Sequence, residues 1–211
     1  MTVSRETLAP LTADDFSRLI PVSRETLDRL SLYAELLIKW QARINLVGPA
    51  TLPDLWRRHF LDSAQLAAHL PAGPVLDLGS GAGFPGLVLA ILGHGPVHLV
   101  ESDQRKCAFL REAARLTGAE VVIHSQRIEG LQNFSVAAVT ARALASVAKL
   151  LEWAEPFLEP DTQCLFLKGQ RCDEELTEAA KQWHITIERI PSLSDPSGLI
   201  LHLREVHRGR P

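Results

Sequence analysis

One acidic residue and three closely spaced glycines follow an apolar run near the middle of the chain. Asp77 lies within this run, and Gly79, Gly81 and Gly83 come at every second position after it. Glycine lets the backbone turn sharply and approach a ligand closely, and the start of a following helix offers unpaired N–H groups. The stretch therefore predicts a binding site for a cofactor that contains a nucleoside.

Two classes of cofactor compete for this stretch. Gly81, Gly83 and Gly86 match the G-x-G-x-x-G pattern of dinucleotide sites, and Glu101 lies about 20 residues further on, where an acid would hold a ribose. However, the carboxylate of Asp77 would repel a pyrophosphate at the helix N-terminus. The pattern Asp-x-Gly-x-Gly-x-Gly is typical of S-adenosylmethionine (SAM) enzymes, whose cofactor carries positive charge that an acid attracts. The charge argument favours SAM, and the Leu and Val after Gly86 exclude a P-loop.

Other candidate residues follow the ends of other predicted strands, where open α/β sheets bind their ligands. Glu101 ends the second strand, and its two oxygens can accept hydrogen bonds from both ribose hydroxyls. Ile128 and Glu129 lie in the turn after the third strand, which would contact the adenine. Arg142 follows the fourth strand and Lys168 ends the fifth. Both cations would face an anion, such as an RNA phosphate or a base acceptor edge, or would pair with acids of the site.

These positions require strands that alternate with helices. We expect strands at 75–78, 97–101, 120–124, 136–140 and 164–168, which predicts a parallel, doubly wound α/β sheet. Two further runs, 184–190 and 199–206, are joined by a turn-rich stretch too short for a crossover helix, so they must pair antiparallel. A parallel sheet that ends in an antiparallel hairpin is the Rossmann-like, seven-stranded sheet of class I SAM-dependent methyltransferases.

The first 71 residues contain no convincing strand and predict an N-terminal helical region. Residues 12–15 resemble a capping box, and apolar residues recur at helical spacing from Leu27 to Ile44. A second helix is expected from about Leu52 to Leu70. The Pro-Ala-Gly-Pro sequence at 71–74 breaks this pattern, so we expect a SAM-dependent methyltransferase domain over 72–211.

Composition limits the classes of function. A chain of 211 residues with 46% hydrophobic content can bury one full core plus an extension. The net charge of -3 is not that of a basic nucleic-acid-binding domain, so RNA contacts need local patches. Three cysteines without a C-x-x-C motif argue against disulfides and a zinc site, so we expect no metal and a reducing cytoplasm. The N-terminus lacks an apolar signal region, and no apolar run approaches the roughly 20 residues of a membrane span, so a soluble cytoplasmic protein is expected.

Motifs that are missing narrow the reaction. The Asn/Asp-Pro-Pro-Tyr run typical of methylation at exocyclic amines is replaced by Thr-Ala-Arg-Ala-Leu at 140–144. Pyrimidine C5 methylation needs a nucleophilic cysteine, but Cys107 lies in a predicted helix and Cys164 begins a strand. Cys172, just past Lys168, stays open, without the usual Pro-Cys or Thr-Cys context. An acceptor that already carries a lone pair fits best.

The chain resembles the bacterial small-subunit ribosomal RNA guanine-N7 methyltransferases, the RsmG (GidB) family, along nearly its whole length. The segments that carry the resemblance are KWQARINLV at 39–47, RHFLDS at 58–63, LDLGSGAGFPG at 76–86, ESDQRK at 101–106, RIE at 127–129, TARA at 140–143 and FLKG at 166–169. The extended glycine loop with Phe-Pro-Gly, together with His-x-x-Asp-Ser upstream, is specific to the family. Ile128 departs from the alanine of many members.

The resemblance implies methyl transfer from SAM to N7 of a guanine in the 530 loop of 16S rRNA, in the RNA itself or in a small ribosomal subunit or its precursor. It also implies cofactor contacts at Gly79, Phe84, the turn at 128–129 and Arg142. Guanine N7 has a free lone pair and no proton, so direct in-line attack needs no general base. The product ring becomes cationic, so we expect Lys168 and Arg142 to hold guanine O6 or the RNA backbone.

A basic edge on the helical region predicts further RNA contacts, although a solvated helix face is an almost equal alternative because acids are interspersed. His59 fits a packed core histidine better than a catalytic one. The expected site comprises Arg142 and Lys168 as catalytic residues; Asp77, Gly79, Ser80, Gly81, Gly83, Phe84, Glu101, Ile128, Glu129 and Arg142 as cofactor-binding residues; and Lys39, Arg43, Arg57, Arg58 and Lys168 as RNA-binding residues. A monomeric RNA methyltransferase is favoured over a NAD-linked oxidoreductase and over a ribosome-assembly factor that binds SAM without turnover.

Overall fold

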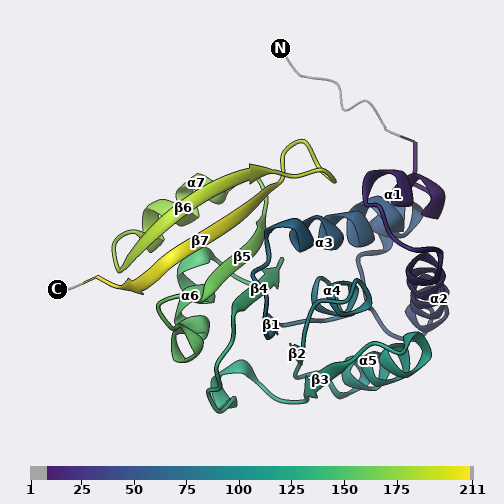
Figure 1. The fold of residues 1–211 in the computed structure, drawn as a ribbon, viewed down its shortest axis with the longest axis horizontal. Coiled ribbons are helices and arrows are strands. Elements are labelled where there is room, and N and C mark those ends of the chain that lie inside the picture. Colours follow the sequence, from purple (N-terminus) through teal and green to yellow (C-terminus); the bar gives the residue numbers. More distant parts are fainter. Residues whose placement is uncertain (1–8, 210–211) are drawn as a thin grey trace.

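A computed structural model describes residues 9–209 of the chain. Residues 1–8, which belong to the N-terminus in which no export signal is expected, lie outside the described residues. Seven strands form one sheet in the order β3-β2-β1-β4-β5-β7-β6 (Figure 1). The strands are β1 (Val75–Leu78), β2 (Val97–Val100), β3 (Val121–His124), β4 (Ala138–Arg142), β5 (Gln163–Lys168), β6 (Trp183–Pro191) and β7 (Leu199–Arg208).

Strands β1 to β5 are parallel, whereas β7 pairs antiparallel with both β5 and β6. This confirms the sheet predicted from the sequence, including its antiparallel hairpin. Strand β4 differs in its bounds, because it extends to Arg142 where the sequence predicted an end at residue 140. Arg142 pairs with Leu167 of β5, so the β-ladder continues beyond the predicted end and fixes the Arg142 backbone at the carboxyl end of β4.

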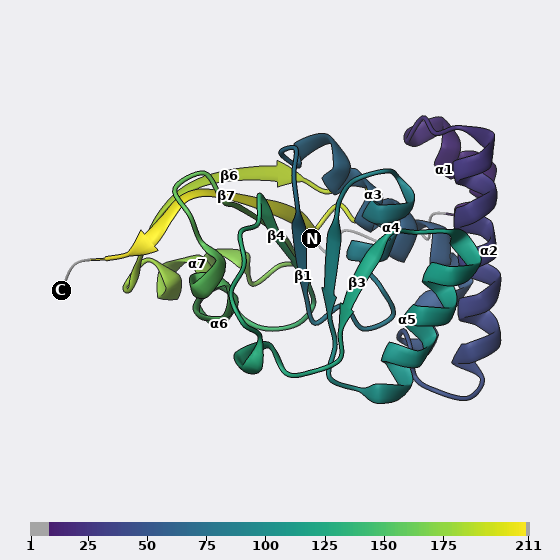
Figure 2. The same ribbon diagram turned by 60° about the horizontal axis from the view of Figure 1, so that its bottom comes forward.

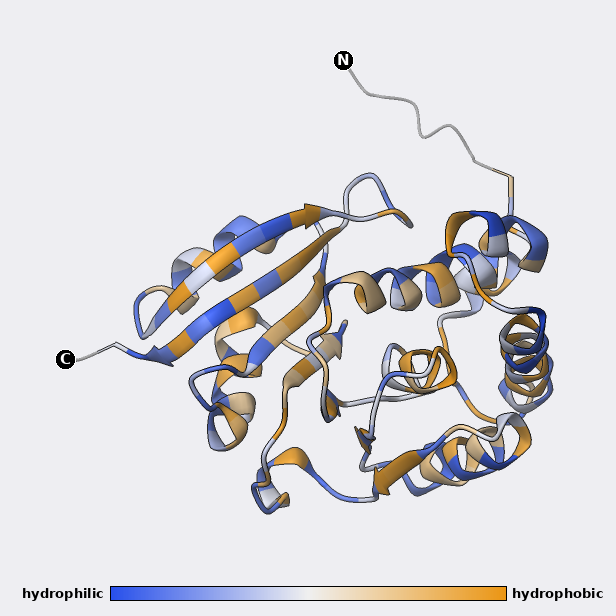
Figure 3. Cartoon of the chain, viewed as in Figure 1, coloured by the Kyte–Doolittle hydropathy of each residue, from blue (hydrophilic) through white to orange (hydrophobic). Residues whose placement is uncertain are grey.

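Helices cover both faces of the sheet (Figure 2). The N-terminal helices, α4 (Gly86–Ile91) and α5 (Gln104–Thr117) cover one face, whereas α6 (Val147–Ala154) and α7 (Cys172–Ala179) cover the other. Because side chains alternate along a strand, Val75 and Asp77 face α4 while Leu76 and Leu78 face the opposite core. Strand β6 carries alternating hydrophobic and hydrophilic residues (Figure 3). This pattern is typical of a strand with only one face in a core.

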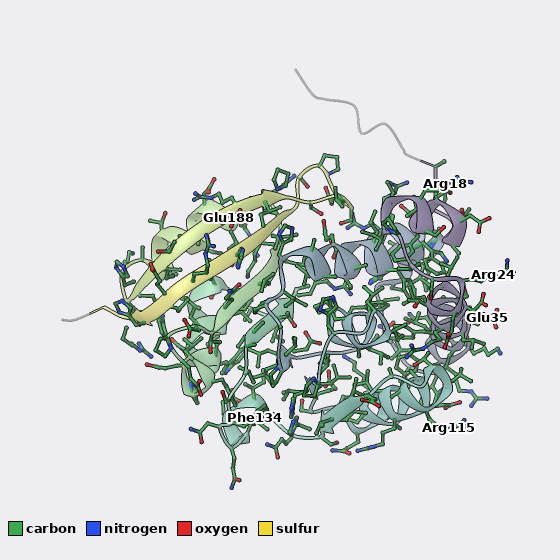
Figure 4. All side chains as sticks on the ribbon, viewed as in Figure 1. Arg18, Arg24, Glu35, Arg115, Phe134 and Glu188 are labelled. Atoms are coloured by element: carbon green, nitrogen blue, oxygen red, sulfur yellow. The ribbon has the colours of Figure 1, made fainter. Side chains whose placement is uncertain are left out.

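The N-terminal helices share their core with the sheet. Helix α1 (Ala13–Leu19) begins with the predicted capping box, in which Thr12 and Asp15 cap each other, and α2 (Arg24–Gln41) follows. Buried residues of α2 such as Tyr33 belong to the same hydrophobic cluster as residues of β1, β5 and α4. Polar side chains such as Arg24, Glu35 and Arg115 project from the outer sides of α2 and α5 (Figure 4).

The prediction of one regular helix from about Leu52 to Leu70 is wrong. The structure has four consecutive short elements, namely η1 (Pro49–Asp54), a π-helical η2 (Trp56–Leu61), α3 (Asp62–Ala64) and η3 (Gln65–His69). Pro53 lies inside η1 and lacks the N–H that a regular helix needs. In the wide turn of η2, the Asp62 N–H bonds back to the Arg57 carbonyl. Such wide turns are frequent at functional sites.

Within residues 9–209, no helix combines the length and the apolar character needed to cross a membrane. The three cysteines are buried and free. The same part of the chain contains no group of three or more His, Cys, Asp or Glu side chains placed to hold a metal ion.

Candidate functional site

The glycine loop between β1 and α4 depends on residues without a side chain. Gly79, Gly81 and Gly83 have φ values of 63°, 58° and 92°, which L-residues with a Cβ rarely adopt. A Cβ on Gly83 would lie 2.8 Å from the Tyr33 hydroxyl. That hydroxyl donates a hydrogen bond to the Ala82 carbonyl, and the Tyr33 ring stacks on Phe84 with ring centroids 5.3 Å apart. Helix α2 therefore supports the loop directly.

The structure gives Asp77 an internal role. Its side chain is fully buried, and it accepts hydrogen bonds from the Gly86 N–H at 3.2 Å and from the Thr140 hydroxyl at 2.9 Å. Burial raises the pKa of Asp77 from 3.8 to about 6, and these hydrogen bonds oppose the shift only in part. The sequence predicted that Asp77 meets positive charge on a cofactor, but here its carboxylate ties β1 to β4 and to the start of α4. Buried Ser80 donates to the Asp77 carbonyl at 3.0 Å, within the same turn.

Glu101 holds the loops at the ends of β1 and β2. Its Oε2 accepts the Gly81 N–H at 2.9 Å, and its Oε1 accepts the Asp103 N–H at 2.7 Å. Each carboxylate oxygen has a second lone pair and can accept another donor, such as a ribose hydroxyl. The side chain at this position can therefore hold a cofactor and the glycine loop together.

The turn after β3 forms a short helix, η4 (Ile128–Gly130). Ile128 is half-buried and packs on the core beside α6, whereas Glu129 is exposed and accepts the Trp153 indole N–H at 3.0 Å. The structure thus places this turn at the carboxyl end of the sheet, as expected, with an apolar and an acidic side chain.

A cavity of about 810 Å³ lies beside the glycine loop, at the carboxyl ends of β4 and β5. Five segments of the chain contribute to its lining: 46–51, 58–62, 142–146, 167–175 and 192–199. The glycine loop itself is not part of the lining. Leu144 connects the two regions, because a Cβ on Gly79 would lie 2.6 Å from the Leu144 Cδ1 atom. The arrangement offers two adjoining subsites, one at the glycine loop and one in the cavity.

Arg142 lies between the two subsites. Its guanidinium carbon is 5.0 Å from the centre of the Phe84 ring in the glycine loop, and its side chain also lines the cavity. Nη1 donates to the Arg58 carbonyl at 3.0 Å and pairs with Asp62 at 3.4 Å, and Nη2 lies 2.8 Å from His59 Nδ1. A guanidinium has five N–H donors, so Nε–H and one Nη2 hydrogen have no partner among the described residues.

Most of the charged side chains that line the cavity are paired. Arg58 pairs with Asp195 at 2.8 Å, and Lys168 pairs with Glu175 at 2.7 Å. The Lys168 ammonium also donates to the Ala145 carbonyl at 2.5 Å, so Lys168 holds the loop after β4 and retains one N–H donor. Two further lining residues, Arg171 and Glu174, form no ion pair within residues 9–209.

The structure brings some of the predicted RNA-binding residues to the cavity and separates others from it. Arg58 and Lys168 line the cavity, as Arg142 does. Lys39 and Arg43 are exposed at the end of α2 and just beyond it, outside the lining. Arg57 is not among the residues that line the cavity; it pairs with Asp54 at 3.0 Å and donates to the Ala9 carbonyl at 2.9 Å.

Sequence reasoning missed the roles of His59 and Asp62. Both lie in the RHFLDS segment that carries the resemblance. Both contact Arg142, which lies 83 residues after His59 and 80 residues after Asp62. Asp62 also accepts the Ser194 hydroxyl at 2.5 Å, which fastens the loop between β6 and β7 to the helical region. The RHFLDS motif was the only signal in the sequence that could have pointed to these two residues, because local periodicity does not reveal their contacts with Arg142.

Comparison with known proteins gives consistent matches. The family model described as rRNA small subunit methyltransferase G matches residues 26–199. The ribosomal RNA small subunit methyltransferase G of Paramagnetospirillum magneticum is 62% identical over 191 residues, covering 90% of this chain and 93% of that protein. Its counterpart in Rhodospirillum rubrum is 59% identical over 200 residues, covering 94% and 100%. The solved structure of a glycopeptide N-methyltransferase complexed with S-adenosyl-L-homocysteine is similar with a TM-score of 0.58 at 13% identity, covering 69% of this chain and 89% of that one. The structural likeness confirms the predicted class I fold.

Proposed function

The chain belongs to the rRNA small subunit methyltransferase G family, and we propose on that basis that it transfers a methyl group from SAM to N7 of a guanine in the 530 loop of 16S rRNA. The substrate would be 16S rRNA, alone or in the small ribosomal subunit or its precursor, in the cytoplasm. We further propose that the enzyme acts as a monomer.

The position of Arg142 between the glycine loop and the cavity is the observation that supports this proposal most directly. In-line transfer requires the methyl donor and the accepting nitrogen to meet at one point, in a fixed direction. The glycine loop and Glu101 would bind SAM, and the adjoining cavity of about 810 Å³ has room for a base. A single side chain that contacts the loop and lines the cavity can orient both partners.

The residues of the chain would act by binding and orientation. SAM supplies the methyl group when bound, and N7 needs no general base because it carries no proton. The unpaired donors of Arg142 and the one remaining donor of Lys168 would hold guanine O6 or a phosphate oxygen. Asp62 and Glu175 neutralise these two cations, so the methylated ring can become positive without facing uncompensated positive charge.

Transfer of a tritiated methyl group from SAM would test the proposal. The substrates are 16S rRNA, small ribosomal subunits and a subunit assembly intermediate, each digested to nucleosides afterwards. We expect label in 7-methylguanosine from at least one of them. Label in another nucleoside would contradict the N7 assignment. Tight SAM binding without transfer would favour an assembly factor, and NADH binding without SAM binding would favour an oxidoreductase.

Glu101→Gln is expected to weaken SAM binding by about 1–3 kcal/mol, the range for hydrogen bonds to a charged group. The amide can accept with only one of its two polar atoms, so either the Gly81 N–H or the Asp103 N–H loses its acceptor, together with any ribose hydroxyl that the same atom would accept. Isothermal titration with SAM measures the change. Glu120→Gln, at an exposed glutamate, is the control. Unchanged affinity in both variants would remove Glu101 from the cofactor site.

Arg58→Ala is expected to weaken RNA binding and to reduce its salt dependence by about one phosphate contact. Single-turnover transfer at saturating RNA should stay nearly unchanged, because the Arg58 carbonyl that holds Arg142 remains. Arg57→Ala is the matched neighbour. It should lower the thermal unfolding midpoint and leave the salt dependence intact, since Arg57 is tied to Asp54 and Ala9. Equal salt slopes for both variants and the wild type would contradict the assignment of Arg58.

A further inference from the structure

His59 contacts Arg142 from the π-helical element η2 and is almost fully buried, with 6% of its surface exposed. The Arg142 guanidinium has donors only, so the His59 Nδ1 atom must accept this hydrogen bond with its lone pair. The imidazole therefore carries its single proton on Nε2. The contact requires this tautomer and excludes the charged form of the ring, in which both nitrogens are donors.

The other side of the imidazole is fixed as well. The His59 Nε2 atom lies 2.7 Å from the Thr51 hydroxyl oxygen, and that hydroxyl lies 2.7 Å from the Gly48 carbonyl. Because a carbonyl only accepts, the Thr51 hydroxyl donates to Gly48 and accepts the proton on Nε2. The hydrogen bonds therefore run in one direction, from Arg142 through His59 and Thr51 to the carbonyl of Gly48, the N-cap residue of η1.

The surroundings of His59 keep the ring neutral. Burial lowers the pKa of His59 from 6.5 to about 3, and the positive charges of Arg142 and Arg58 act in the same direction. The nearby acid, Asp62, is engaged by Arg142 at 3.4 Å and by Ser194 at 2.5 Å. His59 accordingly offers a permanent acceptor across the whole neutral pH range.

These contacts determine how the Arg142 guanidinium is oriented. His59, Asp62 and the Arg58 carbonyl use three of its donors, and the Phe84 ring lies beside it. The unpaired Nε–H and Nη2–H donors therefore have fixed directions before any substrate binds. Preorganised donors of this kind need no rearrangement during the reaction.

We propose that His59 is a positioning residue, which acts as a neutral acceptor to hold Arg142 at the point where the glycine loop meets the cavity. The proposal deepens the function proposed above and rests on it for its kinetic consequences. It extends the active site to Gly48, Thr51 and His59 of the helical region, which also line the cavity.

Two substitutions of His59 separate its acceptor from its packing. Asparagine places an amide oxygen near the position of Nδ1, whereas glutamine is longer and places its amide near Nε2. We expect His59→Asn to lose about fivefold in the single-turnover rate, the equivalent of one neutral hydrogen bond. His59→Gln should lose about a hundredfold through misplacement of Arg142, with RNA and SAM affinities little changed. Thr51→Val, which removes the partner of Nε2, should resemble His59→Asn.

Nitrogen NMR of the wild-type imidazoles tests the same proposal without RNA. The signal absent from His59→Asn identifies His59, and we expect it to show the Nε2–H tautomer with no titration between pH 5 and 8. If the enzyme did not methylate RNA but this signature held, only the proposed function would fail. Titration of His59 near pH 6.5, or equal rate losses in the Asn and Gln variants that track their unfolding midpoints, would overturn the positioning role.

Discussion

Arg142→Ala is expected to slow single-turnover methyl transfer about a hundredfold at saturating RNA and SAM, because misplacement of reacting groups by about 1 Å has an effect of that order. Arg142 contacts the glycine loop through Phe84 and lines the adjoining cavity. Without its guanidinium, neither the methyl donor nor the target base would be held at their meeting point. Rapid-quench measurement of labelled RNA follows the rate.

Two further variants sharpen this expectation. Arg142→Lys keeps the charge but replaces a planar group with five donors by an ammonium with three, so we expect its rate to lie closer to that of alanine than to the wild type. Arg115→Ala is the control, since Arg115 projects from the outer side of α5 (Figure 4). A normal rate with lysine would show that charge alone suffices. A loss confined to RNA affinity in Arg142→Ala would contradict the positioning of guanine by this residue.

The second large effect is expected on the free energy of unfolding when Asp77 is substituted. Asp77→Ala should lower the free energy of unfolding by about 2–4 kcal/mol relative to Asp77→Asn, as a consequence of unpaired buried groups. Alanine leaves the Gly86 N–H and the Thr140 hydroxyl without their partner, whereas asparagine can accept from the first and donate to the second. Urea unfolding of the two variants gives the difference, and neither side chain titrates. Equal stabilities would show that the buried hydrogen bonds contribute little.

Asp77 also predicts a dependence of stability on pH. Its folded-state pKa of about 6 is raised above 3.8, so the folded protein binds the proton more tightly than the unfolded chain does. The contribution of Asp77 is therefore fully present below about pH 4, falls as the pH rises to about 6, and is constant above that. The total change is on the order of 3 kcal/mol. In Asp77→Asn, this component of the pH profile of unfolding should disappear, while a profile identical to the wild type would contradict the raised pKa.

The sheet was predictable from the sequence because its signals are local. Alternating apolar runs and turns defined the strands, and the short link at 191–198 required an antiparallel hairpin. The segment 49–69 was not predictable in its form. Its π-helical turn packs in the tertiary structure, where Phe60 lies against Tyr33 of α2 and Phe84 of the glycine loop, from two other parts of the chain. No periodicity within the segment carries that information.

The candidate site likewise has a part that the sequence predicts and a part that it does not. The spacing of Asp77, the glycines and Glu101 identified the loop, and the structure brings Glu101 into contact with Gly81. Charge type alone suggested that Lys168 is available to RNA, and the structure adds that Glu175 and the Ala145 carbonyl engage two of its three donors. The contact between His59 and Arg142 joins residues 83 positions apart and arises only when η2 packs beside β4. Residue type and spacing therefore indicate the glycine loop, whereas the neighbours of each cation depend on the folded chain.

The position of β7 inside the sheet has a consequence for the genetics of this family member. β7 lies between β5 and β6, so a stop codon or frameshift before residue 199 removes an interior strand and leaves β6 without its partner among the described residues. The edge of β5 would then be exposed and prone to aggregation. We therefore expect null alleles from truncations along the whole reading frame up to this strand, far beyond the codons of the glycine loop.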